Sequence, residues 1–140
     1  MQLSEELARL FTLLWRVTND QRRGASLTRL EYLVLARLER DGAMRAGDLA
    51  HDEGLDPSTL SRRVAALAER GLVERKTDRD DRRAQQLQIT PSGRDAFLAE
   101  QRRRVSLVTD AVAHWPQPDR ARLAELLHDL NDSLQKKAAS

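Results

Sequence analysis

Two short segments of the chain gather hydroxyl and guanidinium groups in the way that a surface for double-stranded DNA requires. The segment 56–63, with the sequence DPSTLSRR, opens with residue types that cap helices and continues with small, hydroxyl-bearing and basic residues. The segment 77–83, with the sequence TDRDDRR, is crowded with arginine. A helix slender enough for a major groove, followed one hairpin later by a basic loop, suits a duplex better than any small substrate.

The first segment predicts a helix with two different faces. With Leu60 at the centre of the inward side, Val64 and Leu67 lie beside it at 3.6 residues per turn. On the opposite side, hydroxyls near the N-terminus can bind phosphate, and an arginine can reach guanine through two hydrogen bonds. The alternative is a solvated surface helix that happens to contain two arginines. The residues predicted to contact DNA from this helix are Ser58, Thr59, Ser61, Arg62 and Arg63.

The second segment predicts a basic hairpin loop. An ordinary hairpin turn is short and uses Asn-Gly or Asp-Gly, whereas this loop is longer and has no glycine. Arginine suits a narrow minor groove with its strong negative potential. The alternative is a surface loop whose charges neutralise one another. The predicted DNA contacts are Arg79, Arg82 and Arg83, and Asp81 is predicted to shape the loop through a salt bridge with Arg83.

The residues that precede these two segments predict two helices. Apolar residues within 3–15 recur at the three-and-four spacing of an amphipathic helix. Two arginines followed by Gly24 predict the end of that helix. Thr28 and Glu31 have the spacing of a capping box, which predicts a second helix that stops near Gly42.

The next two helices are separated only by a tight turn. Residues 48–50 predict the centre of a short helix that Gly54 ends. Asp56 as the N-cap and Pro57 at the first helical position then start the helix of the first segment, and Gly71 ends it. A short glycine-bearing turn between two helices is typical of a helix-turn-helix.

The rest of the chain predicts a hairpin and two helices. Residues 72–76 and 86–90 are the only strand-like runs, and they pair best as a hairpin around the arginine-rich loop. A long helix is predicted over 91–115, broken by prolines within 116–118. A last helix presents leucines at helical spacing within 123–134. The predicted fold is therefore mainly α with a small β-hairpin.

Composition limits the class of protein. At 140 residues, with 40% apolar and 33% charged residues, the chain predicts one folded domain. No apolar run approaches the roughly 20 residues of a membrane span, and the first residues lack the pattern of a secretion signal, so we expect a cytoplasmic protein. The absence of cysteine excludes disulfides, thiol redox sensing and cysteine zinc sites. The formal net charge of +2 favours no partner by itself.

Nothing in the sequence favours an enzyme or a metal protein. It contains no glycine-rich phosphate loop and no serine elbow. The paired acids Asp80 and Asp81 lie among arginines, which would keep them ionised and unreactive. His51, His114 and His128 lack metal-ligand spacing. We therefore expect no catalytic residue, no metal and no cofactor.

Several short motifs follow one another in a specific order: LT at 27–28, DLA at 48–50, LDPSTLSR at 55–62, ERGLVER at 69–75, DDRR at 80–83 and LQITPSG at 87–93. This ordered set resembles the MarR (multiple antibiotic resistance regulator) family of winged helix-turn-helix transcription factors. The resemblance spans essentially the whole chain. It implies a single domain over residues 1–140, with a DNA-binding core at 27–93 and dimerisation helices at 1–24 and 94–137.

The resemblance also implies a function. A homodimer would place each recognition helix in a major groove of a palindromic operator and each wing in an adjacent minor groove. Members usually repress their own operon, and many release DNA when they bind a small, often aromatic ligand. A winged helix that contacts an acidic protein instead of DNA is the alternative, and the salt dependence of binding discriminates between the two.

The dimer has support from the residues themselves. Apolar stripes occur at both ends of the chain, within 3–15 and 123–134, and a lone winged domain needs only one of them to close its core. Pairing the spare surfaces between two chains would set the two-fold symmetry that a palindrome requires. The alternative is a monomer whose terminal helices pack on its own core.

An effector site is the least determined feature. Trp15, Arg16 and Tyr32 lie on the two helices that the resemblance places near the family's ligand cleft. An aromatic wall with one cation would suit an aromatic acid. The alternative is that Trp15 and Tyr32 belong to the core and Arg16 is solvated.

Overall fold

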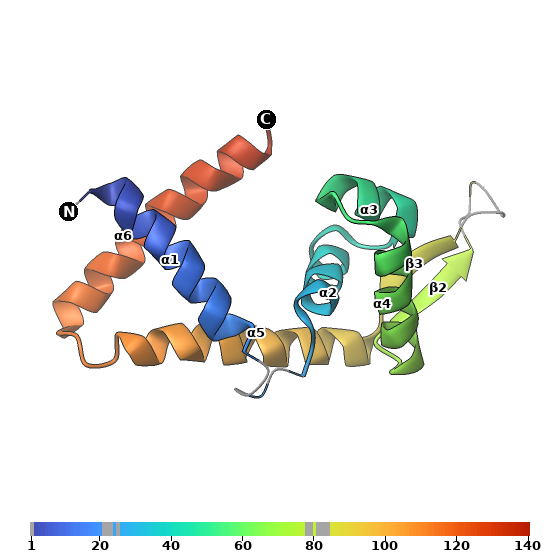
Figure 1. Cartoon of the computed structure of the whole chain (residues 1–140), viewed down its shortest axis with the longest axis horizontal. Coiled ribbons are helices and arrows are strands. Elements are labelled where there is room, and N and C mark those ends of the chain that lie inside the picture. Colours follow the sequence, from blue (N-terminus) through green and yellow to red (C-terminus); the bar gives the residue numbers. More distant parts are fainter. Residues whose placement is uncertain (1, 21–23, 25, 78–79, 81–84) are drawn as a thin grey trace. The chain divides into compact units, whose positions relative to one another are not determined.

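The computed structural model of the chain describes residues 2–20, 24, 26–77, 80 and 85–140. These residues form a mainly helical fold with a small antiparallel sheet, which confirms the predicted fold class (Figure 1). The chain forms two compact units, Met1–Arg104 and Val105–Ser140. The elements in chain order are α1 (Leu3–Thr18), α2 (Arg29–Asp41), β1 (Met44–Arg45), α3 (Ala46–Glu53), α4 (Pro57–Glu69), β2 (Val73–Thr77), β3 (Gln85–Ile89), α5 (Pro91–Ala111) and α6 (Gln117–Ala138).

The first helix ends earlier than predicted. It was expected to run to the arginines before Gly24, but α1 ends at Thr18 with Asn19 as its C-cap. The Thr18 hydroxyl donates to the Leu14 carbonyl at 2.7 Å, and the Asn19 side-chain amide donates to the Trp15 carbonyl at 3.0 Å. Polar side chains thus satisfy carbonyls of the last turn, and the helix needs no glycine to end there.

The capping box that starts α2 is present. The Glu31 amide donates to Thr28 Oγ1 at 3.2 Å, and the Thr28 amide donates to Glu31 Oε1 at 2.8 Å. These reciprocal bonds satisfy backbone donors that the first helical turn leaves without partners. Leu27, just before the cap, is 1% exposed, so the start of α2 is anchored in the core.

The helix-turn-helix of α3 and α4 forms as predicted. Gly54 follows α3 with a φ of +63°, in the left-handed region that favours glycine, and the Leu55 amide donates to the Ala50 carbonyl at 2.8 Å. Asp56 is the N-cap of α4, and Pro57 follows at its first position. Figure 1 shows α3 and α4 joined by this turn, with the hairpin beside α4.

A half-buried arginine fastens α3 to α2. The Arg37 side chain, which is 14% exposed, donates from Nε to Asp41 at 2.9 Å and from Nη2 to Asp52 at 3.1 Å, and its Nη1 bonds Glu53. The last two carboxylates belong to the final turn of α3. Arg37 therefore helps to set the angle at which the helix-turn-helix presents α4.

The sheet has one strand more than expected. Its order is β1-β3-β2, and both pairs are antiparallel. The predicted hairpin is β2 and β3, with Arg75 opposite Leu87. The prediction that the chain has only these two strand-like runs is wrong, because Met44 also pairs with Leu87 from the other side. Two residues are too few to show the alternation that identifies a strand.

The hydrophobic core lies entirely in the first unit. Its buried side chains come from Leu27 and from α2, α3, α4, the start of β2, β3 and the first turns of α5. The inward face of α4 is part of it, as predicted. The core residues are Leu27, Val34, Leu35, Leu38, Leu49, Ala50, Leu60, Val64, Leu67, Leu72, Val73, Leu87 and Phe97.

The start of α5 closes the end of the hairpin. Thr90 Oγ1 accepts from the Gly93 amide at 2.9 Å and donates to the Gly71 carbonyl at 2.6 Å. A Cβ atom at Gly93 would lie 2.0 Å from the Leu72 carbonyl oxygen, so only glycine fits there. The helix ends at Ala111, before the predicted Trp115, and short turns lead from there to Pro116.

The second unit contains the end of α5 and all of α6. No residue of α6 is buried, and its leucines are exposed by 42% to 53% at four positions. The unit therefore presents a row of large apolar side chains that remain about half exposed. The exposed leucines are Leu126, Leu127, Leu130 and Leu134.

Candidate nucleic-acid interface

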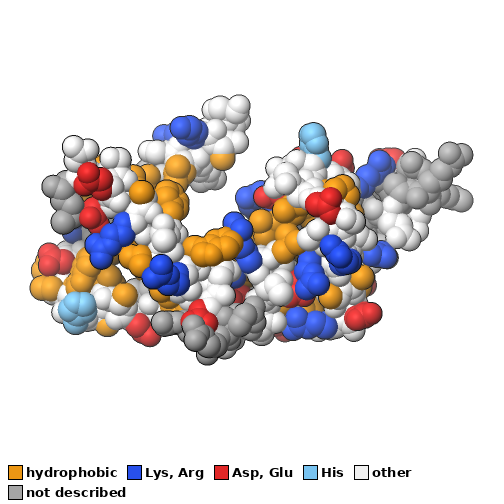
Figure 2. Space-filling view, viewed as in Figure 1, with side chains coloured by type: hydrophobic (Ala, Val, Ile, Leu, Met, Phe, Trp, Pro, Cys, Tyr) orange, Lys and Arg blue, Asp and Glu red, His pale blue; other side chains and the backbone are white. Residues whose placement is uncertain are grey.

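The outward face of α4 combines small, hydroxyl-bearing and basic side chains. Ser58, Ser61 and Arg62 are exposed, whereas Thr59 and Arg63 are half-buried. Figure 2 shows Lys and Arg side chains gathered over the part of the molecule that contains α2 and α4. The helix is therefore firmly held on one side and available to a partner on the other.

The N-terminus of α4 is organised around one carboxylate. Asp56 Oδ2 accepts from the Thr59 amide at 2.9 Å, from the Thr59 hydroxyl at 3.0 Å and from the Ser58 hydroxyl at 2.5 Å. The bond from the Ser58 hydroxyl, followed by those from Thr59, holds the pKa of Asp56 below its usual range, and the charge of Arg62 acts in the same direction. The carboxylate is therefore ionised at neutral pH.

These bonds limit what the two hydroxyls can do. A hydroxyl has one proton to donate, and both Ser58 and Thr59 donate it to Asp56. Each can still accept a hydrogen bond. In this arrangement the two hydroxyls can accept a hydrogen bond from a donor on a base edge. They have no proton left to donate to a phosphate oxygen, which is only an acceptor.

Arg62 reaches outward from the same group. Its Nη2 donates to Thr59 Oγ1 at 3.4 Å, a long and weak bond, and the side chain is exposed. Thr59 thus lies between the N-cap carboxylate and this guanidinium. The arrangement places an anion and a cation side by side on the outward face of α4.

The wing is partly outside the described residues. The paired strands β2 and β3 lie beside α4, and the β2 residues Arg75 and Lys76 are exposed. Arg79, Asp81, Arg82 and Arg83, which the sequence predicts as wing residues, lie outside the part of the chain that the structure describes. Their role stays a prediction.

A groove of about 310 Å³ separates α4 from the wing strands. Leu60, Val64 and Leu87 form its apolar floor, and Ser61 and Arg75 line its sides. Arg75 was not among the predicted site residues. The alternation of side chains along a strand could have identified it, because Arg75 is two residues beyond the buried Val73 and so projects to the same face.

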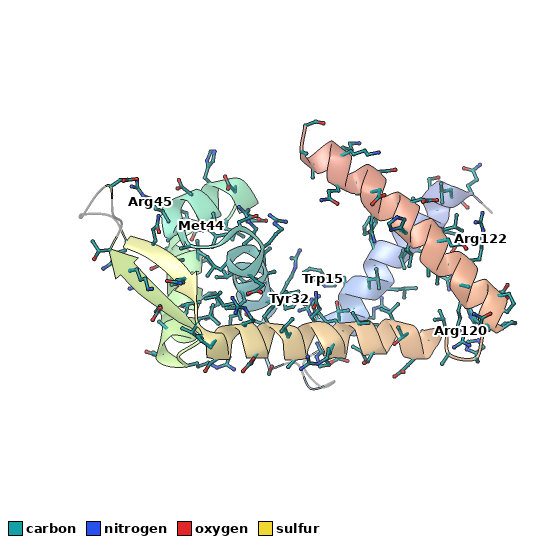
Figure 3. All side chains as sticks on the ribbon, turned by 180° about the vertical axis from the view of Figure 1, so that it is seen from behind. Trp15, Tyr32, Met44, Arg45, Arg120 and Arg122 are labelled. Atoms are coloured by element: carbon teal, nitrogen blue, oxygen red, sulfur yellow. The ribbon has the colours of Figure 1, made fainter. Side chains whose placement is uncertain are left out.

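The three residues predicted for an effector have separate partners. Trp15, on α1, is 50% exposed, and the Arg29 guanidinium lies 3.8 Å from its ring centroid. Tyr32, on α2, is half-buried, and burial raises its pKa. Arg16 is exposed on α1. Figure 3 labels both aromatic side chains. No bond described in the structure joins the three to one another.

Tyr32 belongs to a cluster that the sequence did not predict. Its ring packs on Phe97 at a centroid distance of 5.2 Å, and the Arg104 guanidinium lies 4.0 Å from its centroid. Glu100, only 2% exposed, accepts from Arg104 at 3.1 Å and from Arg103 at 2.6 and 3.0 Å. No periodic pattern distinguishes a buried glutamate on a charged helix from a solvated one.

The same cluster fastens the end of α1. Arg103 Nη2 donates to the Thr18 carbonyl at 2.8 Å, so one buried glutamate holds an arginine that in turn holds the last residue of α1. Burial raises the pKa of Glu100, but the hydrogen bonds from Arg103 and Arg104 outweigh it, and the pKa is lowered overall. The cluster connects α1, α2 and α5 within the first unit.

The described residues contain neither a cluster of metal-ligating side chains nor a membrane-spanning helix. No group of three or more His, Asp or Glu side chains among them has an arrangement that could hold a metal ion. None of the helices in this part of the chain is both long enough and apolar enough to cross a membrane.

Comparisons with known proteins identify the family of this fold. The model of the MarR family matches residues 27–84. An uncharacterised HTH-type transcriptional regulator from Bacillus subtilis, YxaD, is 33% identical over 112 residues, which are 80% of this chain and 78% of YxaD.

Solved structures of transcriptional regulators have a similar fold. The transcriptional regulator Tm0710 from Thermotoga maritima has a TM-score of 0.79 at 20% identity, and the match covers 98% of this chain and 96% of that one. BpsR from Bordetella bronchiseptica has a TM-score of 0.62 at 22% identity, and 94% of each chain is covered. At these identities the likeness concerns the fold.

Proposed function

Because the chain belongs to the MarR family of transcriptional regulators, we propose that it binds a specific double-stranded DNA site through α4. The supporting observation is the two-sided character of that helix. Leu60, Val64 and Leu67 are at most 1% exposed, whereas Ser61 and Arg62 are exposed on the outward side. A rigid helix with small polar and basic residues on its free face suits the major groove.

The wing would add contacts beside that groove. Arginine side chains are well suited to a narrow minor groove, where the negative potential is strongest. Arg79, Arg82 and Arg83 are the candidates, with Asp81 to shape the loop. The described part of β2 supports this assignment, because Arg75 and Lys76 extend the exposed basic character from α4 toward the loop.

The regulator is proposed to act as a homodimer on a palindromic operator. The exposed leucines of α6, together with the exposed Leu10 and Phe11 of α1, provide apolar surface that a second copy can cover. A two-fold dimer presents two recognition helices about one helical turn of DNA apart or a multiple of it, and so selects a palindrome. It would repress transcription in the cytoplasm, by occupying promoter DNA.

Control by a small aromatic acid completes the proposal. In BpsR, which shares this fold, 6-hydroxynicotinic acid regulates DNA binding. In this chain, Trp15 and Arg16 are exposed and could meet such a ligand, with Tyr32 half-buried on the neighbouring helix. If aromatic carboxylates change neither the thermal stability nor the operator affinity of the protein, this part of the proposal is wrong.

The test of the function is a selection of DNA fragments from the source genome by the purified full chain. We expect a palindromic site to be enriched, and its affinity to fall steeply as salt rises, because phosphate contacts release counterions. Binding without sequence preference would contradict the proposal. If the true partner is an acidic protein, the chain should bind that protein in a salt-sensitive manner and should not bind the selected duplexes.

Variants of single arginines locate the surface. Arg62→Ala should blur base preference, at about 1–3 kcal/mol if the contact is to guanine. Arg83→Ala should weaken operator binding while dimerisation survives. Arg120→Ala, at an exposed arginine of α6, removes the same charge from the other unit and should leave the base preference unchanged.

A further inference from the structure

The two oxygens of the Asp56 carboxylate have different surroundings. Oδ2 accepts all three of its hydrogen bonds, from the Thr59 amide and from the hydroxyls of Ser58 and Thr59. Among the described residues, no donor meets Oδ1. Asp56 is exposed and stands at the N-terminal end of α4. One oxygen therefore caps the helix, and the other remains free to accept a bond from a partner.

The free oxygen Oδ1 can accept a hydrogen bond from a base but would repel a phosphate. The N-terminus of a helix ordinarily favours a phosphate, but here a fixed carboxylate already occupies that position. A second anion brought next to it would be repelled. The residues at the N-terminal end of a recognition helix are also those that reach base edges. In the major groove, the groups that can donate to a carboxylate are the N4 amino group of cytosine and the N6 amino group of adenine.

We propose that Asp56 is a specificity-determining residue whose Oδ1 accepts a hydrogen bond from the amino group of a cytosine or adenine in the major groove. This inference rests on the function proposed above. It gives the N-cap two roles, since Oδ2 fixes the start of α4 while Oδ1 reads a base. Arg62, whose Nη2 lies 3.4 Å from Thr59 Oγ1, would read a neighbouring guanine. Asp56 would then supply a hydrogen-bond acceptor and Arg62 the donors.

Asp56→Asn provides a specific test because it replaces the free acceptor oxygen, Oδ1, with a hydrogen-bond donor. All three donors around Oδ2 require an acceptor, so the amide oxygen of asparagine must take that position. Its NH₂ group then points where Oδ1 was, and a donor replaces an acceptor. We expect the preference at one base pair of each half-site to change from the base with an amino group at that point of the major groove to the base with a carbonyl oxygen there, from adenine to guanine or from cytosine to thymine.

Asp56→Ser removes the free group and keeps the cap. Serine, asparagine and aspartate are about equally good N-caps, so both variants should fold and dimerise. With serine, no side-chain atom remains to reach the base, and the preference at that base pair should disappear. Discrimination at that position should fall about tenfold relative to the wild type.

Glu69→Gln is the matched control. It removes one negative charge from the last turn of the same helix, at an exposed position. Glu69→Gln is expected to raise affinity for all duplexes by a similar factor and leave base preference unchanged, because it alters only the electrostatic contribution.

The experiment is a selection from a random duplex library by the full chain and the three variants, followed by binding to operators that carry every base at each half-site position. An inverted preference with asparagine and a lost preference with serine, each confined to one base pair, support the inference, and the wild-type base distinguishes cytosine from adenine. Unchanged preferences in both variants overturn it while the proposed function stands. Loss of affinity with no change of preference also overturns it, since Asp56 would then only position α4. A wild-type chain that selects no sequence overturns both proposals.

Discussion

The two units of the chain differ in the burial of their apolar side chains. Among the described residues of the first unit, the buried hydrophobic ones all lie between Leu27 and Phe97, and most of these side chains are nearly inaccessible. In the second, α6 buries none of its residues, and Leu126 to Leu134 present four large exposed leucines. The helix α4 of the first unit and α6 of the second both have apolar residues at helical spacing, so periodicity alone does not decide whether a face is buried within the chain.

The difference separates two tasks. The winged-helix core closes on itself and can therefore hold α4 rigidly in front of a partner. The apolar row of α6 is larger than a solvated helix needs, and exposed patches of this kind mark surfaces that contact other proteins. Together they support a division in which the core reads DNA and the outer helices pair two chains. Four substitutions test this division.

Leu67→Ala should have the largest effect on stability. This side chain is 0% exposed on the inward face of α4, and truncation of a buried leucine costs about 2–5 kcal/mol of unfolding free energy. Urea unfolding followed by circular dichroism measures it. Because the cavity forms within one chain, the loss should be the same at low and high protein concentration. A loss that disappears on dilution would place Leu67 in an interface instead.

Leu130→Glu should instead act on association. The side chain is 42% exposed in the single chain, and a charge there would disrupt an apolar interface. We expect dimerisation to weaken by about 2 kcal/mol, roughly 30-fold, or more. Sedimentation equilibrium gives the constant, and circular dichroism should show that the monomer remains folded. An unchanged dimer would exclude this face of α6 from the interface.

Glu100→Gln tests the buried cluster of the first unit through pH. The pKa of Glu100 is lowered in the folded chain, so its contribution to stability is complete above its unfolded pKa, about 4.5, and is lost as pH falls through the folded value. The unfolding free energy of the wild type should fall as acid protonates Glu100. The variant has no carboxyl group at this position, so its unfolding free energy should fall less over the same pH range. Urea midpoints from pH 7 to pH 3 measure the difference. Parallel curves for the two proteins would show that the carboxylate is not stabilising.

Arg122→Ala should have the smallest effect. Arg122 Nη1 lies 3.0 Å from Glu125 Oε2, but both side chains are about two-thirds exposed. Exposed pairs of this kind contribute about 0–1 kcal/mol. The unfolding free energy should therefore change by less than about 1 kcal/mol. A larger loss would mean that Arg122 contacts a second chain, and sedimentation of the same variant would detect it.

Features encoded in a few adjacent residues could be predicted from the sequence. The capping box of Thr28 and Glu31, the cap and proline that start α4, and the glycine after α3 all form as predicted, since each depends on hydrogen bonds within one turn. The inward face of α4 was also predicted, because its period is regular.

Features that depend on distant partners were missed. The strand β1 exists only because Met44 meets β3, and the groove position of Arg75 depends on how the hairpin lies beside α4. Glu100 is buried because two neighbouring arginines satisfy it. The early end of α1 depended on side-chain bonds that compete with a simple glycine signal. In each case contacts beyond the local pattern determined the outcome, and a single sequence does not display them.

The number of chains on one operator tests the division between core and outer helices most directly. Multi-angle light scattering of the full chain should be measured with the selected palindrome and with a duplex that carries only one half-site. We predict two chains on the palindrome, and much weaker binding to the single half-site, because a dimer gains from both recognition helices at once. One chain per duplex, with equal affinity for the palindrome and the half-site, would contradict the account.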